Sequence, residues 1–383
     1  MFKLPRAVWL LGWVSLATDA ASEAVYPLLP FFLTTVLGAG AFSLGVIEGA
    51  AEAVNSLLKI LSGRQADKSK AKRPLVLLGY GISSAAKPFI AIVTGPVQVF
   101  IVRILDRLGK GVRSSPRDAM LASWATPQTR GRVYGVHQAM DNLGAVIGPV
   151  LATLFLLASP GHYRTLFALT AIPGAISVLL IFLIPEREGD ANVRAKPTSG
   201  DTGTEPLPPK FRRFMIILAV FALGNSTDAF LLLRLTDAAG SAKFVPLMWA
   251  GIHVVKTAVS FVSGGWSDRI GRRAVISTGW IVYAIVYAGF AFSSSLTALL
   301  AWFLVYGFYF GFAEGTEKAF VADLAPAARR GTAFGIYNAV TGFGALTASL
   351  VFGLLWTMFG APIAFGVGAL LAFIATVLLF VAL

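Results

Sequence analysis

The chain has 383 residues, of which 56% are hydrophobic and only 13% charged, with 29 Phe and no Cys. This composition excludes an ordinary water-soluble protein, because lipid must cover much of the surface, and the lack of Cys excludes disulfides, thiolate metal sites and cysteine nucleophiles. The net charge of +13 suggests nucleic-acid binding, but no basic stripe with interleaved aromatics lies on a soluble segment, so we expect no nucleic-acid partner.

Twelve apolar blocks follow one another along the chain. Each is about 20 to 28 residues long, the length that a helix needs to cross a hydrocarbon layer of about 30 Å. We therefore predict an all-α integral membrane protein with twelve transmembrane helices in a lipid bilayer. The blocks are centred near Glu23, Glu52, Gly81, Arg107, Gly144, Gly174, Leu223, Lys256, Val282, Phe308, Gly344 and Leu371.

One long polar stretch, residues 185–213, interrupts the apolar blocks and is rich in Pro, Gly, Thr and charge. Such a composition is typical of a cytoplasmic linker with little fixed structure. It predicts three regions: an N-terminal six-helix bundle at 1–185, the linker at 186–212 and a C-terminal six-helix bundle at 213–383.

The two predicted halves contain an internal repeat. Three matches occur in the same order: residues 63–73 with 264–273, 130–135 with 330–335, and 15–20 with 224–229. The last match aligns Asp19 with Asp228. Matches in the same order indicate parallel repeats of six helices.

The basic residues are distributed unevenly between the two sides of the predicted helices. Most of the 32 Lys and Arg fall at the amino terminus and in alternate loops on one side, while Arg164 and Lys243 fall on the other. This asymmetry follows the positive-inside rule. We therefore expect a multi-pass protein of the plasma (cytoplasmic) membrane with both termini in the cytoplasm.

Two motifs resemble those of the major facilitator superfamily. The resemblance covers essentially the whole chain. The loop pattern G-x-x-x-D-R-x-G-R-R is matched by Gly264, Asp268, Arg269, Gly271, Arg272 and Arg273. Its first copy keeps Gly63 and Asp67 but has Lys68 and Lys70 at the Arg and second Gly positions. The pattern G-x-x-x-G-P appears as the helix-packing residues Gly144, Gly148 and Pro149, and in this family it is associated with proton-driven exporters. The resemblance implies two pseudo-symmetric six-helix bundles around a central cavity, similar to the drug/proton antiporter group.

The loop motif also predicts a cytoplasmic gate. An Asp at a helix end accepts hydrogen bonds from the first N–H groups of a neighbouring helix, in a contact that forms in one state and breaks in another. By resemblance, Asp67 and Asp268 act as latches, while Lys68 and Arg269 pair with acids near the ends of spans four and ten. The predicted gating residues are Gly63, Asp67, Lys68, Asp118, Gly264, Asp268, Arg269, Arg272, Arg273 and Asp323. The alternative is that these loop charges only set topology.

Many ionisable residues lie within the predicted spans, where they are costly and mark pathways or relays. Ten are basic: Lys59, Lys87, Arg103, Arg107, Lys110, Arg113, Arg117, Arg234, Lys256 and Lys318. Ten are acidic: Asp19, Glu23, Glu48, Glu52, Asp106, Asp118, Asp141, Asp228, Glu314 and Glu317. The two sets balance, so the net charge arises in the loops.

The proton-coupling candidates are carboxylates near mid-membrane. Asp19 and Glu23 lie four residues apart on one helical face, and such adjacent buried carboxylates favour a shared proton. Glu23 and Glu52 are the first choices, followed by Asp19 and Asp228. The alternative is that each is a static partner of an Arg in span four.

The substrate-binding candidates combine a cationic helix face with aromatic and polar side chains. Arg103 and Arg107 face one side of span four, where a carboxylate or phosphate can bind, although neighbouring acids are as well placed to neutralise them. The full set is Tyr26, Arg103, Arg107, Trp249, His253, Lys256 and Tyr306.

The motifs that would indicate an enzyme or an ATP-driven pump are missing. The sequence has no G-x-x-x-x-G-K-[ST], H-E-x-x-H or G-x-S-x-G, so we expect no enzymatic activity, cofactor or metal. We predict a proton-coupled secondary transporter working by alternating access, an efflux antiporter for small amphipathic molecules that acts as a monomer. The alternative is a transporter of a small organic anion held by Arg103, Arg107 and Lys256.

Overall fold

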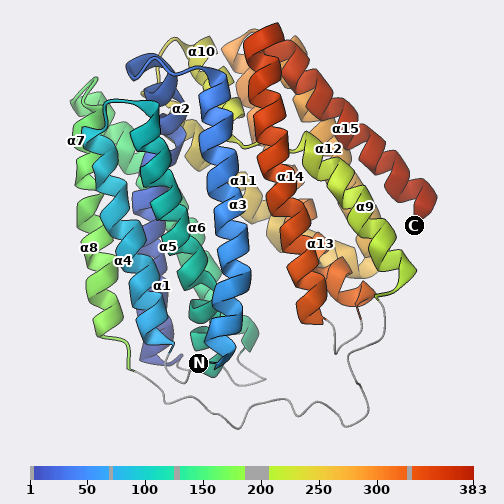
Figure 1. The fold of residues 1–383 in the computed structure, drawn as a ribbon, viewed down its shortest axis with the longest axis horizontal. Helices are drawn as coiled ribbons and strands as arrows, with labels where there is room; N and C mark the ends of the chain where they lie inside the picture. Colours follow the sequence, from blue (N-terminus) through green and yellow to red (C-terminus); the bar gives the residue numbers. More distant parts are fainter. Residues whose placement is uncertain (1–3, 69–71, 125–129, 186–206, 326–329) are drawn as a thin grey trace. The chain divides into compact units, whose positions relative to one another are not determined.

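The computed structural model describes residues 4–68, 72–124, 130–185, 207–325 and 330–383, and all regular structure in these ranges is helical (Figure 1). The helices are α1 (Arg6–Val25), α2 (Leu29–Phe31), α3 (Ala41–Lys68), α4 (Arg73–Ala86), α5 (Pro96–Ser123), α6 (Arg130–Ala158), α7 (Tyr163–Leu169), α8 (Ala171–Phe182), α9 (Pro209–Gly224), α10 (Ala229–Ala239), α11 (Val245–Ile270), α12 (Arg272–Phe292), α13 (Leu296–Leu324), α14 (Arg330–Phe359) and α15 (Ala361–Ala382).

Several predicted spans are made of two or more consecutive helical pieces. The first runs from α1 through η1 (Tyr26–Leu28), α2 and η2 (Phe32–Val36), and the third runs from α4 into η3 (Lys87–Ile92). The sixth combines α7 with α8, and the seventh combines α9 with α10. Grouped in this way, the helices of the described residues form the twelve segments predicted from the apolar blocks.

Eight of these segments are long and apolar enough to span a membrane by length and composition, counted over the described residues. The other four contain α1, α3, α5 and α11. The carboxylates of α1 and α3 and the cationic face of α5 lower the hydropathy of those helices. The charges that weaken the membrane signal include Glu23, Glu52 and Arg107, which are candidate functional residues.

The chain divides into two compact units. The first comprises Met1–Ala39, Ala50–Val193 and Ser241–Ala250, and the second comprises Gly40–Gly49, Arg194–Gly240 and Gly251–Leu383. The bundle boundaries predicted from the sequence, 1–185 and 213–383, stay a prediction. Most of the predicted linker, residues 186–206, lies outside the described residues.

Close helix packing in the first unit depends on the glycines of the fifth span. α1 packs against α6 and α8, and α4 packs against α5 and α8. A Cβ on Gly144 would lie 2.5 Å from the Leu16 carbonyl oxygen, and one on Gly148 would collide with the Ala20 carbonyl oxygen. Only glycine therefore lets α6 approach the α1 backbone this closely, and the buried Pro149 follows directly.

In the second unit, α12 packs against α13 and α15, and α9 packs against α14 and α15. Large aromatic side chains fill this core. The Phe221 ring stacks on the Trp280 indole with centroids 4.4 Å apart, and the Tyr283 and Tyr287 rings stack at 4.1 Å. Such ring pairs bury large apolar areas in a fixed geometry.

One contact occurs in both units. Arg73, the first residue of α4, donates to the carbonyl oxygen of Phe182 at the end of α8 at 2.7 Å. Arg273 of α12 likewise donates to the carbonyl oxygen of Phe380 near the end of α15. Because the last carbonyls of a helix lack partners within the helix, a guanidinium there satisfies one of them and complements the helix dipole.

Candidate functional site

Two spans lose their regular helix where acidic residues lie. In the first span, α1 ends at Val25 and Pro27 and Pro30 follow, so two backbone N–H donors are missing from the next turns. In the seventh span, α9 ends at Gly224 and α10 begins at Ala229, leaving the four residues between them outside regular helix. Interrupted helices inside a membrane occur where the backbone is buried in protein or lines a polar site.

The first polar centre lies beside the break in the first span. The Trp249 indole Nε1 donates to Glu23 Oε2 at 2.7 Å, and the Tyr26 and Trp249 ring centroids lie 5.2 Å apart. The Arg103 guanidinium carbon is 5.6 Å from the Tyr26 centroid, within cation–π range. The structure therefore brings together four predicted site residues, one carboxylate, two aromatic rings and one guanidinium.

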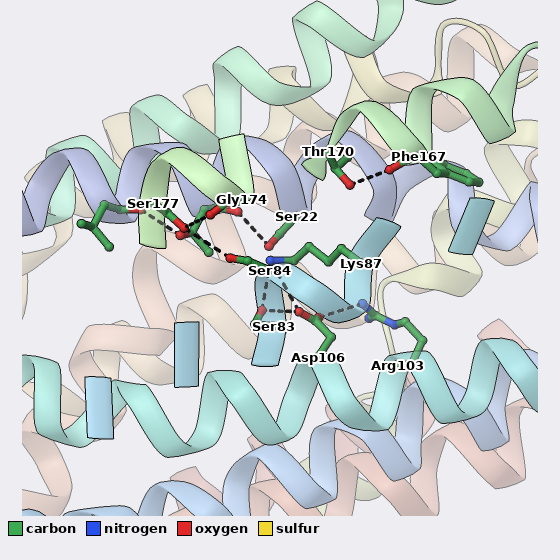
Figure 2. Close-up of polar contacts among 12 residues, drawn as sticks. Ser22, Ser83, Ser84, Lys87, Arg103, Asp106, Phe167, Thr170, Gly174 and Ser177 are labelled. Atoms are coloured by element: carbon green, nitrogen blue, oxygen red, sulfur yellow. Dashed lines mark hydrogen bonds and ion pairs between the residues drawn. The ribbon is translucent and has the colours of Figure 1, made fainter. Parts of the chain in front are cut away.

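A buried ion-pair network lies next to this centre, between η3 and α5 (Figure 2). Lys87 Nζ lies 3.5 Å from Asp106 Oδ1, and Arg103 Nη1 lies 3.4 Å from Asp106 Oδ2. Ser83 Oγ donates to Asp106 Oδ1 at 2.5 Å and accepts from Lys87 Nζ at 3.0 Å. The three charged side chains are at most 6% exposed, so Asp106 neutralises cations that cannot reach water.

Glu52 and Arg107 take part in a second charge group on α3 and α5. Glu52 Oε1 accepts from Asn55 Nδ2 at 3.0 Å, and the carboxylate interacts electrostatically with Lys59, Arg107 and Lys110. Three cations around one carboxylate hold it in its ionised form unless the cations move. This arrangement matches the internal neutralisation that the sequence left open as an alternative to anion binding.

Asp19 lies near the contact of α1 with α6. It interacts electrostatically with Asp141 and Arg113, and His137 Nδ1 lies 3.6 Å from Asp141 Oδ2. The other ring nitrogen, His137 Nε2, is 3.0 Å from Ser15 Oγ. Two carboxylates and an imidazole thus lie on α1 and α6, which a glycine motif holds close together, and Arg113 of α5 interacts with Asp19.

The second polar centre lies at the break in the seventh span. Tyr306 donates its hydroxyl proton to Asp228 Oδ1 at 2.8 Å. The Asn225 side chain donates to the Tyr309 hydroxyl at 3.0 Å, and Tyr283 donates to the free carbonyl of Gly224 at 2.9 Å. Tyrosine hydroxyls therefore satisfy the polar groups exposed by the interrupted helix.

Lys256 and His253 lie on α11 in the second unit. Lys256 Nζ is 3.0 Å from Glu314 Oε2 and 4.6 Å from the Phe310 ring centroid. Glu314 Oε1 also lies 3.6 Å from Lys318 Nζ. The His253 carbonyl accepts from the Thr257 hydroxyl at 2.7 Å, and the imidazole is half-buried. The predicted cationic substrate ligand therefore already has a carboxylate partner.

Of the predicted gating residues, those with described side chains form local contacts at helix ends. Asp323 Oδ2 lies 3.3 Å from Arg272 Nε, and Asp118 Oδ1 lies 3.0 Å from the adjacent Arg117 Nη2. Arg273 instead caps α15. The side chains of the remaining gating candidates, Gly63, Asp67, Lys68, Gly264, Asp268 and Arg269, lie outside what the structure describes.

Several buried or half-buried polar residues of these centres were not among the predicted site residues: Ser83, Lys87, Asp106, His137, Asp141, Tyr283 and Tyr309. Lys87, Asp106 and Asp141 carried a usable signal, since each is an ionisable residue inside an apolar block. Within the described residues no cluster of three or more His, Cys, Asp or Glu has the geometry to hold a metal ion.

Comparison with known proteins places this chain in a family. The family model of the Major Facilitator Superfamily matches residues 10–254 and, in a second match, residues 214–383. An MFS-type transporter of Methanocaldococcus jannaschii is 32% identical over 383 residues, covering 98% of this chain and 95% of the relative. The multidrug resistance protein MdtH of Cronobacter sakazakii is 26% identical over 331 residues, covering 84% of this chain and 79% of its own.

Solved structures agree on the fold. The nucleoside transporter NupG superposes with a TM-score of 0.73 at 16% identity over 98% of each chain. A POT family transporter in complex with 5-aminolevulinic acid superposes with a TM-score of 0.79 at 14% identity, over 99% of this chain and 95% of that one. The predicted all-α membrane fold and the predicted family are confirmed. The chain belongs to the major facilitator superfamily and is a membrane transporter.

Proposed function

We propose that the protein is a proton-coupled antiporter that exports small amphipathic molecules by alternating access. The observation that carries the proposal is the contact of Glu23 with Trp249, whose indole packs against Tyr26. A carboxylate within an apolar helix is a candidate proton carrier, and two adjoining aromatic rings suit the apolar part of an amphipathic molecule.

The Glu23–Trp249 hydrogen bond offers a direct way to link proton binding to substrate binding. An ionised carboxylate accepts a hydrogen bond about twice as strong as a neutral acceptor does. Protonation of Glu23 therefore weakens its hold on the indole and frees Trp249 to change its orientation. In this proposal a proton and a substrate compete for one aromatic and acidic centre, as antiport requires.

The name of one relative, multidrug resistance protein MdtH, agrees with export of varied amphipathic compounds. The glycine motif of α6 agrees with it as well, because the rigid α1–α6 pair would move as one body during the cycle. We also propose that the regions 1–185 and 213–383 are the two moving halves of a monomer in the plasma membrane. Both termini would lie in the cytoplasm, and the pair Arg272–Asp323 would belong to the cytoplasmic gate.

The test is transport by purified protein in liposomes with an imposed pH gradient. A panel of amphipathic dyes and drugs, with ethidium as the fluorescent probe, is added while internal pH is recorded. We expect compound-dependent proton movement, with accumulation of the compound opposite to the proton flow. A panel that produces no compound-dependent proton movement rejects the antiporter.

Two substitutions test the proton site, Glu23→Gln and Glu52→Gln. We expect Glu23→Gln to abolish pH-driven accumulation while exchange at equal pH continues, because the variant still binds but no longer carries a proton. The exposed Asp237→Asn serves as the matched control with unchanged coupling. Unchanged coupling in both Gln variants would remove these carboxylates as proton sites.

The organic-anion alternative predicts a different result. Arg103 and Lys256 each already pair with a carboxylate, so an anion would have to displace Asp106 or Glu314. Arg103→Gln combined with Arg107→Gln should then abolish binding outright. An exporter of amphipathic compounds should instead lose coupling or stability while ethidium still binds.

A further inference from the structure

We propose that Glu317 on α13 is a second proton-binding carboxylate of the transport cycle, held by neutral donors alone. Trp280 Nε1 of α12 donates to Glu317 Oε1 at 2.9 Å, and the Tyr337 hydroxyl of α14 donates to Glu317 Oε2 at 3.1 Å. The residue is 5% exposed and forms no ion pair with any residue that the structure describes. This inference rests on the proposed function, since it names a further site for the coupled proton.

The contrast with Asp106 shows why the absence of a cation matters. Asp106 lies between Lys87 and Arg103, so its negative charge is compensated where it stands. Glu317 has no such compensation, and an ion at membrane depth without a counter-ion is strongly disfavoured. Such a group takes up a proton more readily than a carboxylate that lies next to cations.

The geometry accommodates both forms of Glu317. Each carboxylate oxygen accepts one hydrogen bond and has another lone pair, so a proton can be added without losing either donor. The indole is fixed from behind by the Phe221 ring, stacked at 4.4 Å. The site therefore needs no rearrangement to bind or release its proton, beyond access to water.

Charged neighbours on α13 do not neutralise Glu317. Glu314, one turn before Glu317, and Lys318, the next residue along the chain, interact with Glu317 electrostatically but lie 3.6 Å from each other. The phenol of Tyr309, two turns away, is neutral. The helix thus supplies an acid and a base whose charges offset one another.

On the helices around α13, each described base has another partner or is exposed. On α11, Lys256 pairs with Glu314 at 3.0 Å. On α12, Arg272 pairs with Asp323 and Arg273 caps α15. On α9, the bases Lys210, Arg212 and Arg213 are exposed. Asp228, which precedes α10, bonds Tyr306, whose Cα lies about 16 Å along the α13 axis from that of Glu317.

Protonation of Glu317 would change how three helices hold together. The carboxylate links α12 to α14 through α13, and both hydrogen bonds are stronger when it is ionised. Proton uptake therefore loosens the contacts among these helices, and proton release tightens them. A site of this kind biases a conformational equilibrium according to which side of the membrane supplies the proton.

The experiment is infrared difference spectroscopy of the purified protein, recorded between acid and alkaline pH. We expect a carboxylic acid C=O band that disappears at alkaline pH in the wild type. It should be lost in Glu317→Gln and retained in Glu314→Gln, the matched exposed carboxylate of the same helix. Either Tyr337→Phe or Trp280→Phe should move the band to higher frequency, because one of these two donors bonds the carbonyl oxygen of the protonated acid.

Three outcomes overturn the inference: no titrating C=O band in the wild type, a band that survives in Glu317→Gln, or a band moved by neither Tyr337→Phe nor Trp280→Phe. These two donor variants keep the proposal falsifiable if Glu317→Gln fails to fold. The pH-gradient assay with ethidium in liposomes separates this result from the proposed function. Wild-type protein that titrates at Glu317 but moves no compound refutes the antiporter and not the proton site.

Discussion

Replacing Asp106 with Asn tests whether the buried network beside Tyr26 stabilises the first unit. Asp106 is the shared partner of Lys87 and Arg103, and these side chains are 4% to 6% exposed. Asn keeps the shape but removes the charge, so two buried cations lose a counter-ion. Removing one partner of a buried ion pair costs about 3–5 kcal/mol, and we expect the free energy of unfolding to fall by that amount.

The assay is unfolding by sodium dodecyl sulfate in mixed micelles, followed by the intrinsic Trp fluorescence. Asp118→Asn is the control. Asp118 pairs with Arg117, its neighbour in sequence, and the Asp118 side chain is 51% exposed. Such an exposed pair should contribute about 0–1 kcal/mol.

A double-mutant cycle sharpens the test. Lys87→Met removes one of the two cations, so adding it to Asp106→Asn should cost less than the sum of the single effects, by about 0.5–3 kcal/mol. If Asp106→Asn is as stable as the wild type, or if the two effects simply add, the proposed role of this carboxylate as counter-ion is refuted.

Three further predictions concern the glycine motif, the repeated arginine contact and the second polar centre. Gly148→Ala should destabilise the protein by about 1–3 kcal/mol in the same unfolding assay, whereas Gly81→Ala, where an added Cβ meets nothing within 4 Å, should be neutral or stabilising. Arg273→Gln should lower the free energy of unfolding by about 0.5–2 kcal/mol through loss of a helix cap, and no loss would show that the carbonyl is equally well hydrated. Tyr306→Phe removes the hydroxyl that donates to Asp228 and should lower the free energy of unfolding by about 1–3 kcal/mol. An unchanged unfolding midpoint would contradict this.

The fold was readable from the sequence because each part of it leaves a local signal. Twelve apolar blocks predict twelve helical segments, and the described helices group into that number. Pro27 and Pro30 even mark where the first span loses its regular helix. Membrane insertion makes such signals unusually strong, since every backbone polar group must be satisfied within its own segment.

The partners of the charged residues were harder to predict from the sequence. The spacing of Asp106 after Arg103 predicts contact on one helix, but Lys87 comes from another span and its position depends on packing. Glu23 and Trp249 are separated by 226 residues, and nothing local indicates their hydrogen bond. The balance of acids and bases in the sequence left neutralisation open as one of two alternatives, without showing which acid neutralises which base.

Glu317 illustrates the same limit from the opposite direction. By sequence it is one acid among ten in the spans and has a Lys next to it. Its environment becomes distinctive only when Trp280 and Tyr337 close around it from two other helices. A site defined by the absence of a counter-ion has no sequence motif, because it depends on no cation lying close to the carboxylate in the folded protein.

The repeated arginine contact has a consequence for the order of biosynthesis. Arg73 is the first residue of the third span and Arg273 the second residue of the ninth, but each bonds a carbonyl three spans later, in the sixth or the twelfth. Chains emerge from the ribosome amino terminus first, and their parts fold as units. Each arginine can therefore bond its partner carbonyl only after three more spans have been made. The contact forms only once a set of six helices has been synthesised.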